Sequence, residues 1–170
     1  CYLLSVVILG ILMIRGRRSG RQYLLFGLMA VTLGAGDAFH LIPRAFALLT
    51  DGLERHVAAL GTGKFITSLT MTAFYVLLYH VWRERYGMKK RPGTSALVYG
   101  LAAARAALCL FPQNAWTSGV QPLSWAVYRN IPFALLGMLI IILFYGSAKA
   151  KGDAAFRWIW LTIVLSFAFY

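Results

Sequence analysis

The sequence predicts an all-α protein, a bundle of transmembrane helices that crosses a lipid bilayer several times. Of its 170 residues, 60% are hydrophobic and 13% are charged, whereas a soluble domain normally carries about 25% charged residues. The mean hydropathy is +0.69. The apolar residues fall in long blocks separated by short basic segments, which is typical of polytopic membrane proteins. Tryptophans lie near the borders of these blocks, as in the aromatic belts of membrane proteins: Trp82, Trp116, Trp125 and Trp158.

Six apolar segments predict six helices in a single integral membrane domain over residues 1–170. The first is "CYLLSVVILGILMI", and the second ends with "GAGDAFHLIPR". The third passes through "GTGKFITSLT", and the fourth ends with "LAAARAALCLFP". The fifth follows the uncharged connector "PQNAWTSGVQPLSW", and the sixth closes with "WIWLTIVLSFAFY". The predicted helices cover approximately residues 1–14, 22–43, 56–82, 94–111, 125–145 and 156–170.

The first and last apolar segments are shorter than the other four. A helix needs about 20 residues to cross the hydrocarbon region, and the sequence does not begin with Met. We therefore expect the sequence to be a fragment in which both terminal helices are truncated, and the full protein to have seven or more helices.

The distribution of cations between the segments predicts the orientation in the membrane. The first, third and fifth connectors are basic, whereas the second carries both signs and the fourth carries no charge. Because cytoplasmic loops are enriched in Lys and Arg, these three connectors are predicted to be cytoplasmic and the first residue to lie outside. The compact helices and short loops favour a bacterial inner membrane. The basic residues of the three connectors are Arg15, Arg17, Arg18, Arg21, Arg83, Arg85, Lys89, Lys90, Arg91, Lys149, Lys151 and Arg157.

The net charge of +12 raises the possibility of nucleic-acid binding. The cations lie in connectors between apolar blocks and do not interleave along one exposed face, so nucleic acid is excluded as a partner. The two cysteines, Cys1 and Cys109, lie in apolar surroundings and are interpreted as inert buried thiols.

Polar residues interrupt the outer half of the second to fifth predicted helices. Ionisable residues inside a membrane are costly and generally face protein or water. In the second helix, an aspartate, a histidine and an arginine fall on one face at 100° per residue. The polar residues in the outer halves of the second to fifth helices are Asp37, His40, Arg44, Lys64, Arg105, Arg129 and Asn130.

The charges at this depth do not balance. Asp37 is a single carboxylate against Lys64, Arg105 and Arg129, and unpaired cations in a dry site are unfavourable. Guanidinium groups suit phosphates and carboxylates. The sequence therefore predicts an outward-facing positive pocket among the second, third, fourth and fifth helices, which binds an anionic small molecule or lipid headgroup. A protein of this kind is a transporter or a receptor-like binder.

Two other functions remain open. In a membrane hydrolase acting on a lipid-like substrate, Asp37 and His40 are the catalytic candidates, with His40 as a base oriented by Asp37. Asp37, His40 and His56 are then the candidate ligands of a divalent metal. In a structural membrane protein, the same polar groups form a salt-bridge network between helices. No HExxH, Walker, CxxC or nucleophile-elbow motif is present, so enzymatic activity, cofactor and oligomeric state stay open.

Two glycine pairs lie at similar depth on neighbouring helices, Gly34 with Gly36 and Gly61 with Gly63. Small residues let helix backbones approach closely, and this is the favoured interpretation. The alternative is local unwinding that exposes backbone amides to a substrate, as in the broken helices of transporters.

Overall fold

The computed structural model of the protein describes residues 2–16, 20–50, 52–88 and 91–168. Within these ranges the fold is all-α, as predicted, with six α-helices and two short 3₁₀ turns. Several residues used in the sequence argument lie outside the described residues: Cys1, Arg17, Arg18, Asp51, Lys89, Lys90 and Tyr170. The helices are α1 (Tyr2–Arg15), α2 (Arg21–Leu49), α3 (Val57–Tyr86), α4 (Pro92–Leu110), α5 (Leu123–Lys151) and α6 (Ile159–Ala168), and the turns are η2 (Leu53–His56) and η3 (Pro112–Asn114).

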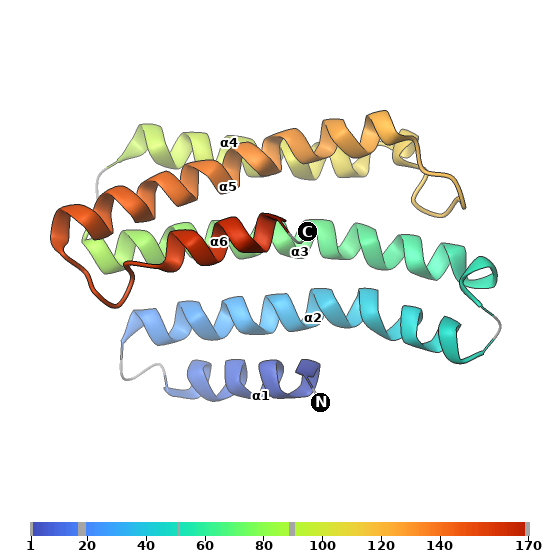
Figure 1. Cartoon of the computed structure of the whole chain (residues 1–170), viewed down its shortest axis with the longest axis horizontal. Coiled ribbons are helices and arrows are strands. Elements are labelled where there is room, and N and C mark those ends of the chain that lie inside the picture. The colour runs from blue at the N-terminus through green and yellow to red at the C-terminus, as the bar shows by residue number, and fades with distance from the viewer. Residues whose placement is uncertain (1, 17–19, 51, 89–90, 169–170) are drawn as a thin grey trace.

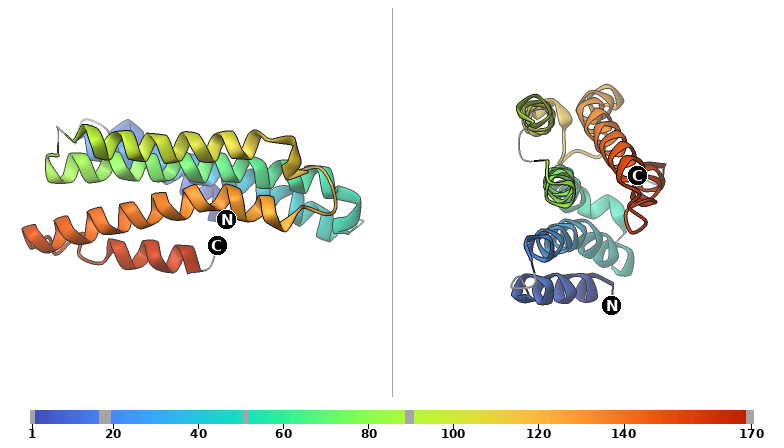
Figure 2. Two further views of the ribbon diagram at one scale, coloured as in Figure 1. Left: turned by 90° about the horizontal axis from the view of Figure 1, so that it is seen from above. Right: turned by 90° about the vertical axis from the view of Figure 1, so that its left-hand side faces the viewer.

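The helices lie roughly along one axis (Figure 1). In the end-on view of Figure 2, α1, α2 and α3 follow one another in a row, and α4 and α5 lie beyond α3. Helix α3 packs against α2, α4 and α5, whereas α6 packs against α5. The central helix of the bundle is therefore α3.

The buried hydrophobic core lies mainly between α3 and α5. The Tyr75 ring meets Phe133 edge to face with centroids 5.1 Å apart, and Trp82 donates a hydrogen bond from Nε1 to the Leu143 carbonyl at 2.9 Å. In a bilayer, such packing and interhelical hydrogen bonds hold helices together. The residues of this core that are completely or almost completely buried include Tyr75, Tyr79, Val81, Trp82, Phe133, Leu136, Ile140 and Phe144.

Four stretches of the described residues are long and apolar enough to cross a membrane. They are Arg21–Leu49, Leu53–Tyr86, Pro92–Leu110 and Leu123–Lys151. Helices α1 and α6, with 14 and 10 residues, fall short of the roughly 20 residues that a span requires. Large apolar side chains such as Leu49, with 85% of its surface exposed, cover much of the exterior, and exposed apolar surface on this scale is rare in soluble monomers.

Several helix ends differ from the predicted ones. Helix α2 continues through Pro43 to Leu49, and α5 continues past Tyr145 to Lys151. Pro43 lacks the N–H that would donate to the Phe39 carbonyl, and its ring crowds that carbonyl, but α2 continues past it to Leu49. The apolar run reflects bilayer thickness rather than helix length, so a helix extends beyond it into polar surroundings. Helix α6 starts at Ile159, three residues later than predicted, because turns occupy residues 154–158.

Candidate functional site

A polar cavity of about 420 Å³ lies between α2, α3, α5 and the loop that joins α4 to α5. It brings together five of the residues that the sequence singled out, from three different helices. The remaining lining comes from two hydroxyl side chains of α3 and one tryptophan of the loop. The complete lining is Asp37 and His40 from α2, Lys64, Thr67 and Ser68 from α3, Trp116 from the loop, and Arg129 and Asn130 from α5.

The Arg129 side chain lines this cavity and is mostly buried, with 9% of its surface exposed. Its Nη1 donates a hydrogen bond to Oδ1 of Asn114 at 3.0 Å. Its guanidinium carbon also lies 4.3 Å from the centroid of the Trp116 ring, within the range of a cation–π contact. Both of these contacts are with neutral side chains.

The loop after α4 holds Asn114 and Trp116 in place through the end of that helix. The last carbonyls of an α-helix have no intrahelical donor. Asn114 donates from Nδ2 to the carbonyls of Leu108 at 2.7 Å and Phe111 at 2.9 Å, and Trp116 donates from Nε1 to that of Cys109 at 2.9 Å. The same two side chains therefore cap α4 and position Arg129. Cys109 itself is buried, as predicted.

Helices α2 and α3 approach closely beside the cavity. Thr67 donates from Oγ1 to the Gly36 carbonyl at 3.0 Å, and a Cβ added at Gly36 would collide with Thr70. A Cβ at Gly63 would collide with the Phe39 carbonyl, the one that Pro43 leaves without its helical donor. Both glycine pairs lie in continuous α-helix. The close-approach interpretation is therefore the one the structure supports at these positions.

Lys64 lies between two cavities. Its exposed side chain lines the polar cavity and also a neighbouring cavity of about 500 Å³, whose walls include Glu54, Gly61 and Gln121. Asp37, across the polar cavity, accepts a hydrogen bond from Tyr2 Oη at 3.3 Å. Within the described part of the chain, neither Lys64 nor Asp37 forms an ion pair.

Arg105 occupies a different place from the one expected. It is completely buried, and its guanidinium carbon lies 3.6 Å from the centroid of the Phe133 ring on α5. It is not among the residues that line the cavity with Lys64. Residue 105 faces the α4–α5 contact, where the π-face of Phe133 contributes to holding the cation. The position of Arg105 in the sequence predicts its depth along α4, but it does not predict whether the side chain faces α5 or the cavity.

Arg44 and His56 also lie outside the cavity lining. Arg44 is exposed near the C-terminal end of α2, and the His56 ring packs edge to face against Phe46 with centroids 5.4 Å apart. Among the residues that the structure describes, no three His, Cys, Asp or Glu side chains are grouped so that they could hold a metal ion. Asp37, His40 and His56 are therefore not brought together as a ligand set.

Asn114 and Trp116 were not recognised as site residues from the sequence. Its position near a segment border predicts Trp116 to be an interfacial tryptophan, and the charge pattern gives no role to the neutral Asn114. A signal for Asn114 is present, because Asn shortly after a helix-ending Pro112 is a residue that bonds to nearby backbone groups.

No family model matches the chain, and neither a curated protein nor a solved structure matches it. The fold and the cavity together define its class, an all-α protein with four candidate membrane spans and a basic cavity between its long helices.

Proposed function

We propose that this is an integral membrane protein that binds an anionic small molecule or lipid headgroup in the polar cavity, as a transporter or receptor-like binder. In this proposal the four long apolar helices cross a bacterial inner membrane. The positive-inside rule then directs the cavity to the outer side. The observation that carries the proposal is that Lys64 of α3 and Arg129 of α5 line one cavity, in which Asp37 is the single carboxylate among the described residues of the lining.

The charge balance of the lining favours an anionic ligand. Lys64 and Arg129 contribute two positive charges against one negative charge from Asp37. A central cation in a membrane helix costs about 3 kcal/mol on insertion scales. An anion in the cavity offsets this cost, and the attraction is stronger in low-dielectric surroundings than in water.

The hydrogen-bond donors of the cavity also favour an anion. Ser68 donates from Oγ to the Lys64 carbonyl at 2.9 Å, and Thr67 donates to Gly36. These two hydroxyl protons are therefore already engaged with backbone. The lining also includes the ammonium group of Lys64, the guanidinium group of Arg129 and the amide of Asn130, and N–H donors of these kinds suit phosphate and carboxylate oxygens.

The test measures thermal unfolding of the detergent-purified protein with inorganic phosphate, glycerol 3-phosphate or acetate, against chloride at the same ionic strength. A ligand that binds only the folded state raises Tm. Lys64→Gln should reduce the anion affinity about tenfold or more, equivalent to about 1.4 kcal/mol. Because Lys64 is exposed, this variant should remain folded. The matched control is Arg15→Gln, an exposed charge at the end of α1.

Anion-dependent stabilisation that survives in Lys64→Gln, or that Arg15→Gln also removes, would contradict binding at this cavity. Stoichiometric zinc in the purified protein, lost on His40→Ala, would favour the membrane hydrolase instead. Loss of folding in Lys64→Gln with no response to any anion would favour the structural salt-bridge protein.

A further inference from the structure

A second basic cavity lies at the opposite end of α5, where the chain turns into α6. Its volume is about 390 Å³. Two cations and three large aromatic side chains dominate its walls, together with one carboxylate. These residues are Tyr145, Lys149, Asp153, Arg157, Trp158 and Trp160.

The two cations of this cavity lie against aromatic rings. Lys149 Nζ is 5.9 Å from the centroid of Tyr145, and the guanidinium carbon of Arg157 is 5.0 Å from that of Trp158. Both cationic side chains are exposed, and within the described residues neither forms an ion pair. The two positive charges are therefore available to a ligand in the cavity.

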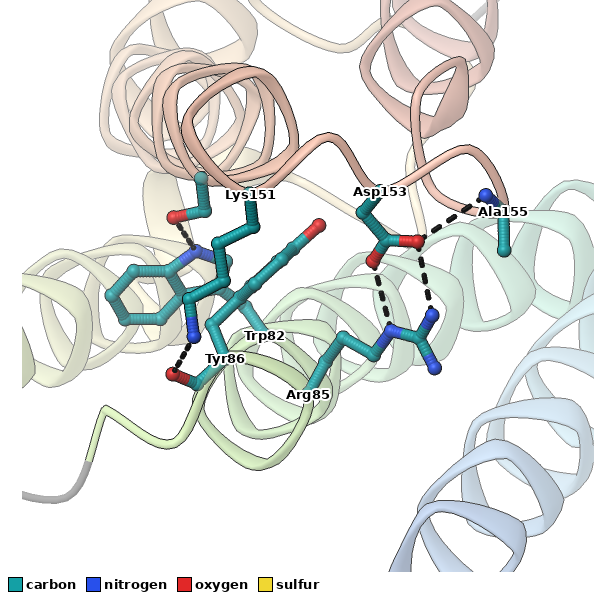
Figure 3. Close-up of polar contacts among 7 residues, drawn as sticks. Trp82, Arg85, Tyr86, Lys151, Asp153 and Ala155 are labelled. Carbon is teal, nitrogen blue, oxygen red and sulfur yellow. Dashed lines mark hydrogen bonds and ion pairs between the residues drawn. The ribbon is translucent and has the colours of Figure 1, made fainter.

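The carboxylate of the cavity is already neutralised from the other side. Arg85 of α3 donates to Asp153 from Nε to Oδ2 and from Nη2 to Oδ1, both at 2.9 Å (Figure 3). These hydrogen bonds lower the pKa of Asp153 to about 2, so the pair stays ionised at neutral pH. Asp153 is thereby occupied by Arg85 and does not compensate Lys149 or Arg157.

The turn is held in shape by α3. Besides the Arg85–Asp153 pair, Lys151 donates from Nζ to the Tyr86 carbonyl at 3.0 Å (Figure 3). Gly152 has a φ of +60°, a conformation that favours glycine, and ends α5 there. The cavity is thus formed before a ligand arrives, which reduces the entropic cost of binding.

The location of the cavity indicates a lipid as the ligand. It adjoins the end of the candidate span Leu123–Lys151, on the side that the charge pattern predicts to be cytoplasmic. Trp158 and Tyr145 are 55% and 47% exposed, and such amphipathic rings favour the headgroup level of a bilayer. Basic pockets between helices on this side bind the headgroups of anionic lipids.

We propose that this cavity binds the phosphate of an anionic phospholipid, with Lys149 and Arg157 as the phosphate ligands. The rings of Tyr145, Trp158 and Trp160 pack beside the glycerol and the first carbons of the acyl chains. The site is separate from the polar cavity between α2, α3 and α5, and it does not depend on the ligand of that cavity.

The test is retention of lipid by native mass spectrometry. Protein is released from nanodiscs that contain equal amounts of phosphatidylglycerol and phosphatidylcholine, and the retained lipids are counted. The wild type should retain more phosphatidylglycerol than phosphatidylcholine. In the Lys149→Gln, Arg157→Gln double variant, the ratio of the two retained lipids should fall about tenfold. The matched control is the Arg15→Gln, Arg91→Gln double variant, which removes two exposed charges at the same predicted side.

A second variant, Trp158→Leu, keeps both cations and should weaken retention through the aromatic wall. Equal preference in the wild type and the Lys149→Gln, Arg157→Gln variant would overturn the proposal. An equal loss in the control double variant would also overturn it, since general surface charge would then explain retention. If millimolar inorganic phosphate displaces phosphatidylglycerol from the wild type as well as soluble phosphatidylglycerol does, the site takes free phosphate and not a lipid.

Discussion

The side chain of Asn114 is completely buried and uses both ends of its amide. The NH₂ group donates to carbonyls around the end of α4, and the oxygen accepts from Arg129. A buried polar group left without a partner costs about 1–3 kcal/mol. The position of Arg129 in the cavity and the capping of α4 therefore both depend on the neutral side chain of Asn114.

Asn114→Ala should lower the free energy of unfolding by about 2–4 kcal/mol, because truncation leaves helix-end carbonyls with fewer donors and removes an acceptor from Arg129. Gln113→Ala, an exposed neighbour in the same turn, should change it by less than about 0.5 kcal/mol. The measurement is an unfolding titration from mild detergent into sodium dodecyl sulfate. Equal effects of the two substitutions would show that the Asn114 contacts contribute no special stability.

The charged residues of the site were the part that could be predicted, because a cation inside an apolar run is conspicuous. Lys64 and Arg129 were found in this way, and both line the cavity. Arg105 could not be separated from them, because its role depends on which way α4 is rotated, and the sequence fixes only its depth. Asn114 was missed because its contribution comes from loop geometry and not from charge.

At the scale of the helix, the two glycines of α3 serve two different neighbours. Residues two apart on a helix are separated by about 200°, so Gly61 and Gly63 point to nearly opposite sides. A Cβ at Gly63 would meet the Phe39 carbonyl of α2, and a Cβ at Gly61 would meet the Trp116 carbonyl of the loop. The pair lets α3 contact both walls of the cavity closely.

Gly61→Ala should destabilise the protein by about 1–3 kcal/mol, because the loop carrying Trp116 has to move away from the added methyl group. Gly100→Ala is the matched control, since a Cβ at Gly100 in the middle of α4 meets nothing within 4 Å. It should stabilise the protein by up to about 1 kcal/mol through helix propensity. The shifts in Tm of the two variants should have opposite signs, and a shared sign would refute this account of the glycine pair.

At the scale of the helix, the sequence predicts the number of helices and their approximate positions better than it predicts where each helix ends. The apolar blocks correspond to the six α-helices that the structure describes, because a helix that packs in lipid or in a core needs an apolar run. The ends of α2 and α5 were placed too early, because polar residues at a helix terminus continue the helix once it leaves the apolar region. Pro43 shows the same point, since the bond it removes is local and α2 continues to Leu49.

The whole molecule has different chemistry at its two ends. One end holds the polar cavity of Lys64 and Arg129, and the other holds the Arg85–Asp153 pair and the second basic cavity. The aromatic core of α3 and α5 lies between them. The order in which the helices pack was not predictable, because α3 and α5 are apolar around most of their circumference and no single face marks the partner.

Orientation is the property of the whole molecule on which the assignment of both cavities depends. The positive-inside pattern predicts that the α4–α5 loop is outside and the α5–α6 turn is cytoplasmic. In a Cys1→Ser background, Val120→Cys should react with a membrane-impermeant maleimide in intact cells, whereas Ala154→Cys should react only after permeabilisation. Both positions are exposed, and the native Cys109 is buried. The reverse pattern would place the cavity of Lys64 and Arg129 on the cytoplasmic side, so that its anion would come from the cell interior, and would move the phospholipid site to the outer leaflet.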